Sequence, residues 1–151
     1  MIIILMFFDY LTKTLIINSF EVNDSMILIK DFLKFYYIKN YGASFGMLSG
    51  QTILLVIFTV VAIIYLFGEI KKSKSLLLIF SSSLIIGGAL GNLIDRVFRG
   101  YVIDFISFTL FGSEMPIFNL ADIFISFGVI IYLYIVLMEG KYERNNNRRR
   151  K

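Results

Sequence analysis

The chain has 151 residues, 58% of them hydrophobic, and a net charge of +4 at pH 7. Soluble domains are only about half apolar, so an ordinary soluble domain is excluded and one integral membrane domain is expected. Histidine and cysteine are both absent from the sequence, which rules out Ser-His-Asp and Cys-His catalytic sites and any thiolate zinc site.

Four apolar segments each approach the ~20 residues that cross a membrane as a helix. Their expected bounds are residues 2–20, 52–70, 76–96 and 116–138, and together they form a single membrane domain over residues 1–140. Backbone groups in lipid must be paired internally, so the predicted fold class is an all-α membrane protein. A basic tail, residues 141–151, follows the last segment.

Lysines and arginines gather in two places, between the second and third segments and after the fourth. Such charges mark the cytoplasmic side of a membrane protein. Both termini are therefore expected in the cytoplasm, and the longer connections, residues 21–51 and 96–115, outside. We interpret the basic tail as a contact with anionic lipid rather than with nucleic acid.

The first segment contains Asp9 and Lys13. They are four residues apart, so they would lie on the same face of a helix. Pairing avoids a cost of roughly 3 kcal/mol for each unpaired charge at a helix centre. A carboxylate partner keeps Lys13 charged, which argues against a Ser/Lys hydrolase. The segment has no basic start and no small-residue cleavage site, so it is predicted to be a retained helix rather than a signal peptide.

The first outer connection contains two short β-prone runs, residues 26–29 and 35–38, with charged residues between them. A small extracytoplasmic sheet or strand pair is expected there. The turn-prone stretch that follows, residues 40–46, indicates by itself no more than a loop.

The third segment ends in Gly87-Gly-Ala-Leu-Gly-Asn92-Leu-Ile-Asp95-Arg96. Gly87 and Gly91 are four residues apart, a spacing that lets a neighbouring helix approach closely. Asn92, Asp95 and Arg96 fall on one helix face. An ionic network that holds helix ends together explains Asp95 best, whereas structural and functional roles stay open for Asn92 and Arg96.

Two further aspartates occur in or beside apolar segments. Apolar and aromatic residues surround Asp104 in the second outer connection, where desolvation should raise the pKa of its carboxyl. The fourth segment begins at Pro116, and Asn119 and Asp122 share one face of the expected helix. Counted from Pro116, Asp122 lies roughly 9 Å along that helix. Carboxylates at such places are costly, so Asp104 and Asp122 are predicted to be functional.

Together these motifs resemble the bacterial lipoprotein signal peptidases (type II), a family of aspartic intramembrane peptidases. The resemblance covers residues 8–138 and rests on five motifs in the same order: Asp9-x-x-x-Lys13, Asn40-Tyr-Gly-Ala-Ser-Phe45, Gly87-Gly-Ala-Leu-Gly-Asn92-x-x-Asp95-Arg96, Val102-Ile-Asp104-Phe105 and Phe118-Asn119-Leu-Ala121-Asp122. Each motif alone is only moderately specific for this family. The five motifs together, in the same order, are a strong indication of the resemblance.

The resemblance implies an endopeptidase that removes the signal peptide of prolipoproteins by cutting before a diacylglyceryl-modified cysteine. It places the catalytic pair at Asp104 and Asp122. It assigns contacts with the substrate, or with the inhibitor globomycin, to Asn40, Gly42, Asn92, Arg96 and Asn119, and ionic support to Asp9, Lys13 and Asp95. Departures from the family pattern, such as Tyr10 and Ser44, affect the handling of substrate rather than the chemistry.

Two neighbouring carboxylates share one proton, so the charged one can activate water while the protonated one polarises the scissile carbonyl. This chemistry requires no metal and no other cofactor. The expected partners are a diacylglyceryl prolipoprotein and membrane lipid, without nucleic acid. The enzyme is expected to be a monomer of the bacterial cytoplasmic (inner) membrane, with its active site toward the extracytoplasmic face.

Two other functional classes are alternatives, a carrier and a structural scaffold. A proton-coupled carrier would use Asp9, Lys13, Asp95, Asp104 and Asp122 as a relay across the membrane. The second segment has no charge between residues 52 and 67, and most ionisable residues lie near one face, which disfavours a relay. A structural scaffold would predict that Asp104, in a loop, tolerates replacement.

Overall fold

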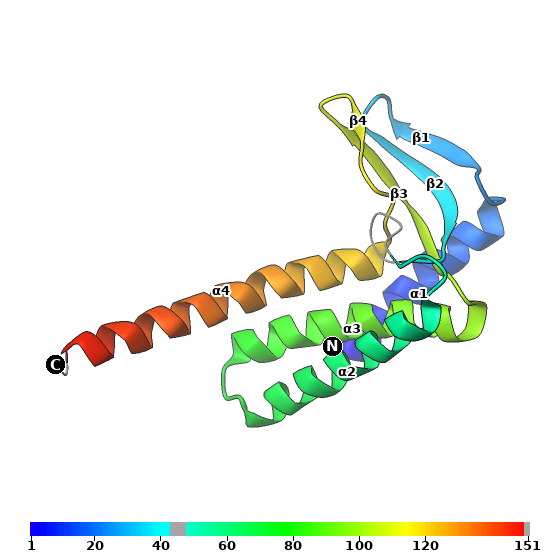
Figure 1. The fold of residues 1–151 in the computed structure, drawn as a ribbon. Helices are drawn as coiled ribbons and strands as arrows, with labels where there is room; N and C mark the ends of the chain where they lie inside the picture. Colours follow the sequence, from blue (N-terminus) through cyan, green and yellow to red (C-terminus); the bar gives the residue numbers. More distant parts are fainter. Residues whose placement is uncertain (43–47, 150–151) are drawn as a thin grey trace.

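The computed structural model describes residues 1–42 and 48–149. Its elements in chain order are α1 (Ile2–Ser19), β1 (Ser25–Ile29), β2 (Leu33–Asn40), α2 (Thr52–Lys72), α3 (Leu76–Arg99), β3 (Val102–Leu110), β4 (Ser113–Glu114) and α4 (Leu120–Arg149). Figure 1 shows the helices running side by side and the strands gathered into a sheet at one end of them. The stretch expected as a basic tail continues α4 as far as Arg149.

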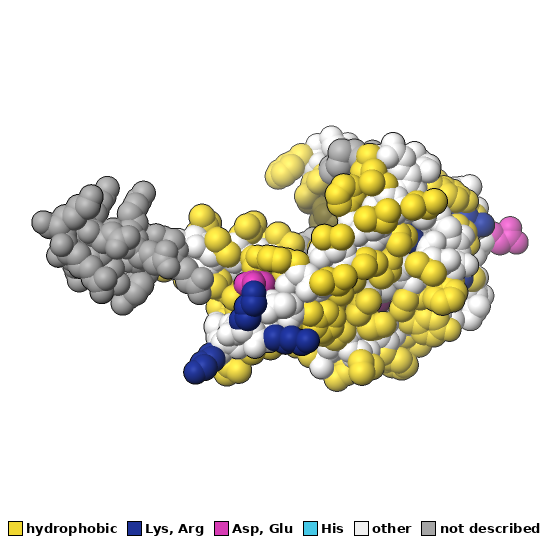
Figure 2. All heavy atoms as spheres, turned by 60° about the horizontal axis from the view of Figure 1, so that its bottom comes forward, with side chains coloured by type: hydrophobic (Ala, Val, Ile, Leu, Met, Phe, Trp, Pro, Cys, Tyr) yellow, Lys and Arg dark blue, Asp and Glu magenta, His cyan; other side chains and the backbone are white. Residues whose placement is uncertain are grey.

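All four helices are long and apolar enough to cross a membrane, with mean hydropathy between 1.5 and 2.7 and the apolar part of α4 at Leu120–Met138. Hydrophobic side chains cover the helical surface on the face that Figure 2 shows, and basic side chains gather where α2 meets α3. An apolar exterior of this kind is stable against lipid and not against water. The prediction of a four-helix membrane protein is confirmed.

Helix α3 lies at the centre of the bundle and packs against each of the other three helices. Half of its membrane-spanning window is buried, against 11–17% in the other helices. A side chain at Gly87 or Gly91 would collide with α1, where Leu5 and the carboxylate of Asp9 lie against these glycines. The predicted close approach at this glycine pair is therefore confirmed, and it brings a charged residue of α1 onto α3.

The strands form one antiparallel sheet in the order β1-β2-β3-β4. Both runs expected to be β lie within β1 and β2, so the small sheet is confirmed, although β3 and β4 were not expected. Buried side chains of Ile16, Tyr37, Ile103 and Phe105 pack together and join the C-terminal end of α1 to the sheet.

Two expectations about the second outer connection were wrong. Asp104 lies on strand β3 and not in a loop, because residues 102–108 pair with β2. Helix α4 begins at Leu120 and not at Pro116, because Phe118 is held in an extended conformation by backbone hydrogen bonds to Ile106 of 2.8 and 3.1 Å. Asp122 therefore lies in the first turn of α4 instead of deeper along a helix.

Candidate active site

Asp104 is fully buried on β3, and two amide groups bind its carboxylate. The side-chain nitrogen of Asn40, at the end of β2, donates to Oδ2 at 2.7 Å, and that of Asn119 donates to Oδ1 at 2.7 Å. Burial is the largest effect on the carboxyl group, followed by the nearby charge of Asp122, and together they raise the pKa of Asp104 to about 7. Asp104 thus changes its charge near neutral pH.

Asp122 is oriented by the start of its own helix. The backbone N–H of Asp122 donates to Oδ1 of Asn119 at 3.0 Å, and the N–H of Asn119 donates back to Oδ2 of Asp122 at 3.2 Å. This reciprocal pair is a capping box, which satisfies two of the free N–H groups at a helix start. Oδ1 of Asp122 accepts a third bond, 2.8 Å long, from Asn92 of α3.

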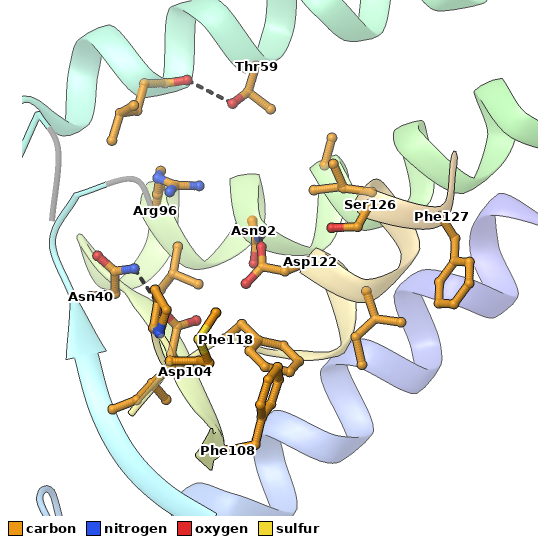
Figure 3. A pocket seen from close by; sticks show the side chains of 18 residues that line it. Asn40, Thr59, Asn92, Arg96, Asp104, Phe108, Phe118, Asp122, Ser126 and Phe127 are labelled. Carbon is orange, nitrogen blue, oxygen red and sulfur yellow. Dashed lines mark hydrogen bonds between the residues drawn. The ribbon is translucent and has the colours of Figure 1, made fainter. Parts of the chain in front are cut away.

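A continuous chain of amide hydrogen bonds joins the two aspartates. Asn119 binds Asp104, Asn92 binds Asp122, and the amide nitrogen of Asn119 also donates to Oδ1 of Asn92 at 3.1 Å. Both carboxylates face the same cavity, as Figure 3 shows. Residues of three elements, α3, β3 and α4, therefore converge on one carboxylate pair.

Lys13 fixes the orientation of this chain from behind. Its ammonium lies 2.7 Å from Asp9 and 2.9 Å from Asp95, and it donates to Oδ1 of Asn92 at 3.0 Å. Because Oδ1 of Asn92 accepts from Lys13 and from Asn119, the amide nitrogen of Asn92 is directed at Asp122. The predicted pairing of Asp9 with Lys13 is confirmed, and the carboxylate of Asp95 is a second partner of Lys13.

The partners of Lys13 hold the surrounding elements in place. Asp9 accepts the backbone N–H of Ala121 at 3.0 Å and so ties α1 to the first turn of α4. Asp95 pairs with Arg99 at 3.1 Å and accepts the N–H of Ile103 at 3.4 Å, at the start of β3. The ionic network that the sequence indicated for Asp95 therefore exists, and it joins helix ends to the strand that carries Asp104.

Arg96 and Gly42 fix the other side of the site. The guanidinium Nη2 of Arg96 donates to the carbonyl of Gly42 at 2.9 Å, and the N–H of Gly42 donates to Oδ1 of Asn40 at 2.9 Å. With its oxygen occupied in this way, Asn40 presents its nitrogen to Asp104. Phe45, the last residue of the motif that begins at Asn40, lies outside the described residues, as does Ser44.

The aspartates open into a cavity of about 650 Å³. Asn40, Asn92 and Arg96 line it beside the carboxylates, while Leu55 and Ala89 are among the apolar residues of its membrane-embedded walls. The remaining predicted residues lie just behind this lining, hydrogen-bonded or ion-paired to it directly or through one further residue: Gly42, Asn119, Asp9, Lys13 and Asp95. Every predicted site residue is therefore part of one cluster.

Some residues of the cavity were not predicted from the sequence. Thr59 of α2 and Ser126 of α4 bring hydroxyl groups to its walls, and Phe108 and Phe118 contribute packed aromatic rings 5.5 Å apart. Figure 3 shows the Ser126 hydroxyl directed into the cavity, one helical turn from Asp122. Serine and threonine are ordinary residues of membrane helices, so no pattern in the sequence distinguishes these two.

Comparison with known proteins identifies the family. The family model described as signal peptidase (SPase) II matches residues 1–138. The chain belongs to the signal peptidase II family. It is therefore a multi-pass bacterial membrane enzyme of the peptidase class, and none of the proteins described below supports the carrier alternative.

Several relatives in the signal peptidase II family match most of the chain. The lipoprotein signal peptidase of Clostridium tetani is 41% identical over 140 residues, covering 89% of this chain and 88% of the relative. That of Staphylococcus aureus is 37% identical over 142 residues, covering 91% and 86%. A solved structure titled a bacterial membrane enzyme has a TM-score of 0.87 and 36% identity, covering 92% of this chain and 86% of the other.

Proposed function

We propose that this protein is a lipoprotein signal peptidase in which Asp104 and Asp122 form the catalytic pair. The observation that supports this assignment is the amide chain that links the two carboxylates at the end of one cavity. A structural ion pair needs a cation between its carboxylates. Among the described residues, the hydrogen bonds that connect the two carboxylates are made by neutral amides, and neighbouring carboxylates of this kind share one proton.

The catalytic step follows from the shared proton. With the pKa of Asp104 raised to about 7, the pair carries one proton near neutral pH. The ionised carboxylate removes a proton from a water molecule held between the two groups, and the protonated carboxyl donates a hydrogen bond to the scissile carbonyl. The water oxygen attacks the carbonyl carbon, and the departing amine takes up the proton as the peptide bond breaks.

Arg96 and the asparagines serve positioning. Asn40, Asn92 and Asn119 have committed their amide nitrogens to the aspartates, which fixes the carboxylates before substrate arrives. The guanidinium of Arg96 has five N–H groups, and at the edge of the cavity it can hold a peptide carbonyl beside the cleavage site. Replacing Arg96 or one of these asparagines is therefore expected to weaken substrate binding and to lower the rate of cleavage.

The shape of the cavity suits a lipid-modified substrate. Residues of α2, α3 and α4 with apolar side chains line the part of the cavity that lies along the membrane helices, including Leu55, Ala89 and Ile125. A signal peptide that crosses the bilayer can lay its last apolar residues along these walls, with the scissile bond at the aspartates. The diacylglyceryl chains of the modified cysteine then stay in the surrounding leaflet.

The active site faces the extracytoplasmic side in this proposal. The carboxylate pair lies at the same end of the bundle as the sheet, whereas the exposed Lys71, Lys72 and Lys74 lie at the opposite end, where α2 meets α3. The side with the lysines is cytoplasmic by the positive-inside rule. One chain supplies all the residues described here, so the protein is proposed to act as a monomer.

The assignment is tested with purified protein and a diacylglyceryl-modified prolipoprotein peptide. Mass determination should find two products whose masses correspond to a single cut before the modified cysteine. The same peptide without the lipid, as a control for general proteolysis, should be cleaved much more slowly. Cleavage elsewhere, or no cleavage by correctly folded protein, would refute the proposed function.

A further inference from the structure

The end of the sheet farthest from the helices has an exposed apolar surface, which we call the sheet tip (residues 29–32 and 110–112). The two turns of the tip are adjacent, because the N–H of Thr109 donates to the carbonyl of Phe32 at 2.8 Å. Ile29, Phe32 and Leu110 are 53%, 47% and 36% exposed, and Phe111 is completely exposed. Phe111 therefore packs against nothing among the described residues, and the other three side chains are only partly buried.

The backbone at Phe111 is unfavourable for the residue it carries. Leu110 pairs with Ser113, so Phe111 and Gly112 form a two-residue turn with φ angles of 50° and 78°. Turns of this kind prefer asparagine followed by glycine, because both residues need a positive φ. A phenylalanine that is strained by the turn and packs against nothing does not help the sheet to fold, so its side chain points to a contact outside the chain.

The position of the sheet tip indicates what that contact is. Figure 1 shows the sheet leaning away from the helices, so that the tip lies level with the first turns of α4 and not beyond the helix ends. These turns belong to the stretch Leu120–Met138, which is apolar enough to cross the membrane. At that depth, beside the bundle, the surrounding medium is the leaflet on the sheet side.

We propose that the sheet tip is a membrane anchor, with Phe111 inserted among the acyl chains of this leaflet and Phe32 at its surface. Exposed Lys30 and Asp31 on the neighbouring turn place the rest of the tip among the lipid headgroups. Lipid is the occupant because a bilayer-embedded chain always has it at this depth, whereas a protein partner would have to displace it.

The anchor would position the catalytic strand. Strand β3 is tied at one end to Asp95 through the N–H of Ile103, and it ends at the tip beside Phe111. Asp104 lies between these two attachments. Docking both ends of β3 therefore sets the depth of Asp104 relative to the membrane surface, where a lipid-tethered substrate presents its cleavage site.

The absence of tryptophan from the chain allows a direct test. The full-length variants Phe111→Trp and Val22→Trp each carry a single reporter, the second one in the turn between α1 and β1, at the opposite end of the sheet. Both are reconstituted in vesicles of phosphatidylcholine and phosphatidylglycerol, with or without bromine on the acyl chains near the headgroups. The emission wavelength and its quenching by bromine are then measured.

The proposal predicts that Trp emission in Phe111→Trp is blue-shifted and mostly quenched by the brominated lipid, while that in Val22→Trp is neither. Water-like emission without quenching in Phe111→Trp would overturn it. Blue-shifted emission that bromine leaves unchanged would also overturn it, since the tip would then be covered by protein, such as a second copy. Peptidase activity is not needed for the readout, so these results are independent of the proposed function.

Discussion

Asn119 shows how much one side chain contributes at this site. Its oxygen accepts the N–H of Asp122 as a helix cap, and its nitrogen donates both to Asp104 and to Asn92. A side-chain amide offers an oxygen acceptor and two N–H donors, whereas an ionised carboxylate offers acceptors alone. Aspartate at this position would preserve the helix cap but lose both donated hydrogen bonds. The amide of Asn119 can therefore cap α4 and hold the proposed catalytic pair at the same time.

The rate of cleavage should depend on pH in a bell-shaped manner. The alkaline limb of the pH–rate profile reflects the loss of the shared proton. Its midpoint should lie near pH 7, because the pKa of Asp104 is raised to about 7. The acidic limb reflects protonation of both carboxylates, and the two apparent values belong to the pair. Measuring kcat/KM from about pH 4 to about pH 9 checks this. A rate that stays constant through neutral pH would contradict a shared proton.

The same carboxyl group should make folding stability depend on pH. The pKa of Asp104 is about 7 in the folded protein, against an ordinary value of 3.8. Between these values the folded state binds more protons than the unfolded state, so the free energy of unfolding falls as pH rises and the loss is complete above neutral pH. It amounts to about 4 kcal/mol at most, at about 1.4 kcal/mol per pKa unit.

Asp104→Asn removes this titration. The melting temperature of the variant relative to that of the unmodified protein should therefore increase as pH is raised from about 4 to about 8. The hydrogen bond that asparagine loses beside Asn40 or Asn119 shifts the difference equally at every pH and leaves the trend unchanged. A constant difference across this range would show that burial does not raise the pKa of Asp104.

At the scale of elements, the sequence predicted the helices and strands whose position follows from local composition. The four helices and strands β1 and β2 follow from apolar length and β-prone runs. Strand β3 was missed because Asp104 and its apolar neighbours show no alternation, since both faces of its first residues are buried. The start of α4 was placed too early because the extended pairing of Phe118 with Ile106 is a tertiary contact, and Pro116 alone fits a helix start equally well.

The ionic network that connects the elements should be important for stability. Lys13→Met leaves the carboxylate of Asp9 buried without the cation it pairs with and leaves Asp95 with Arg99 alone, which should cost about 3–5 kcal/mol. As a matched control, Lys34→Met removes a lysine whose partner Glu114 is largely exposed, and it should cost no more than about 1 kcal/mol. Unfolding in detergent measures both. Equal losses in the two variants would mean that the buried network does not hold the helices.

At the scale of the whole molecule, residues from every part of the chain meet at the site. The sequence identified Asp9, Lys13 and Asn92 because charged and amide groups are conspicuous in apolar segments, and the resemblance supplied their expected roles. It could not reveal that Lys13 acts on Asp122 through Asn92, since that relation depends on how three helices pack. The hydroxyl groups of Thr59 and Ser126 in the cavity wall could likewise be recognised only from the structure.

The proposed orientation in the membrane can be tested because the chain has no cysteine. Single cysteines are introduced as Val22→Cys, near the sheet, and Lys74→Cys, between α2 and α3. A membrane-impermeant maleimide added to intact cells should label the first and should label the second only after permeabilisation. The reverse pattern would place the active site in the cytoplasm.

The central claim is that Asp104 and Asp122 together perform the cleavage, and single substitutions test it most directly. Asp104→Asn and Asp122→Asn, assayed with the lipidated peptide, should each lower the rate by at least about 100-fold, the smallest effect expected for a lost general acid or base. Both variants should still insert into the membrane, and Glu21→Gln, at the exposed turn after α1, should cleave normally. Cleavage at the unmodified rate by either site variant would contradict the account.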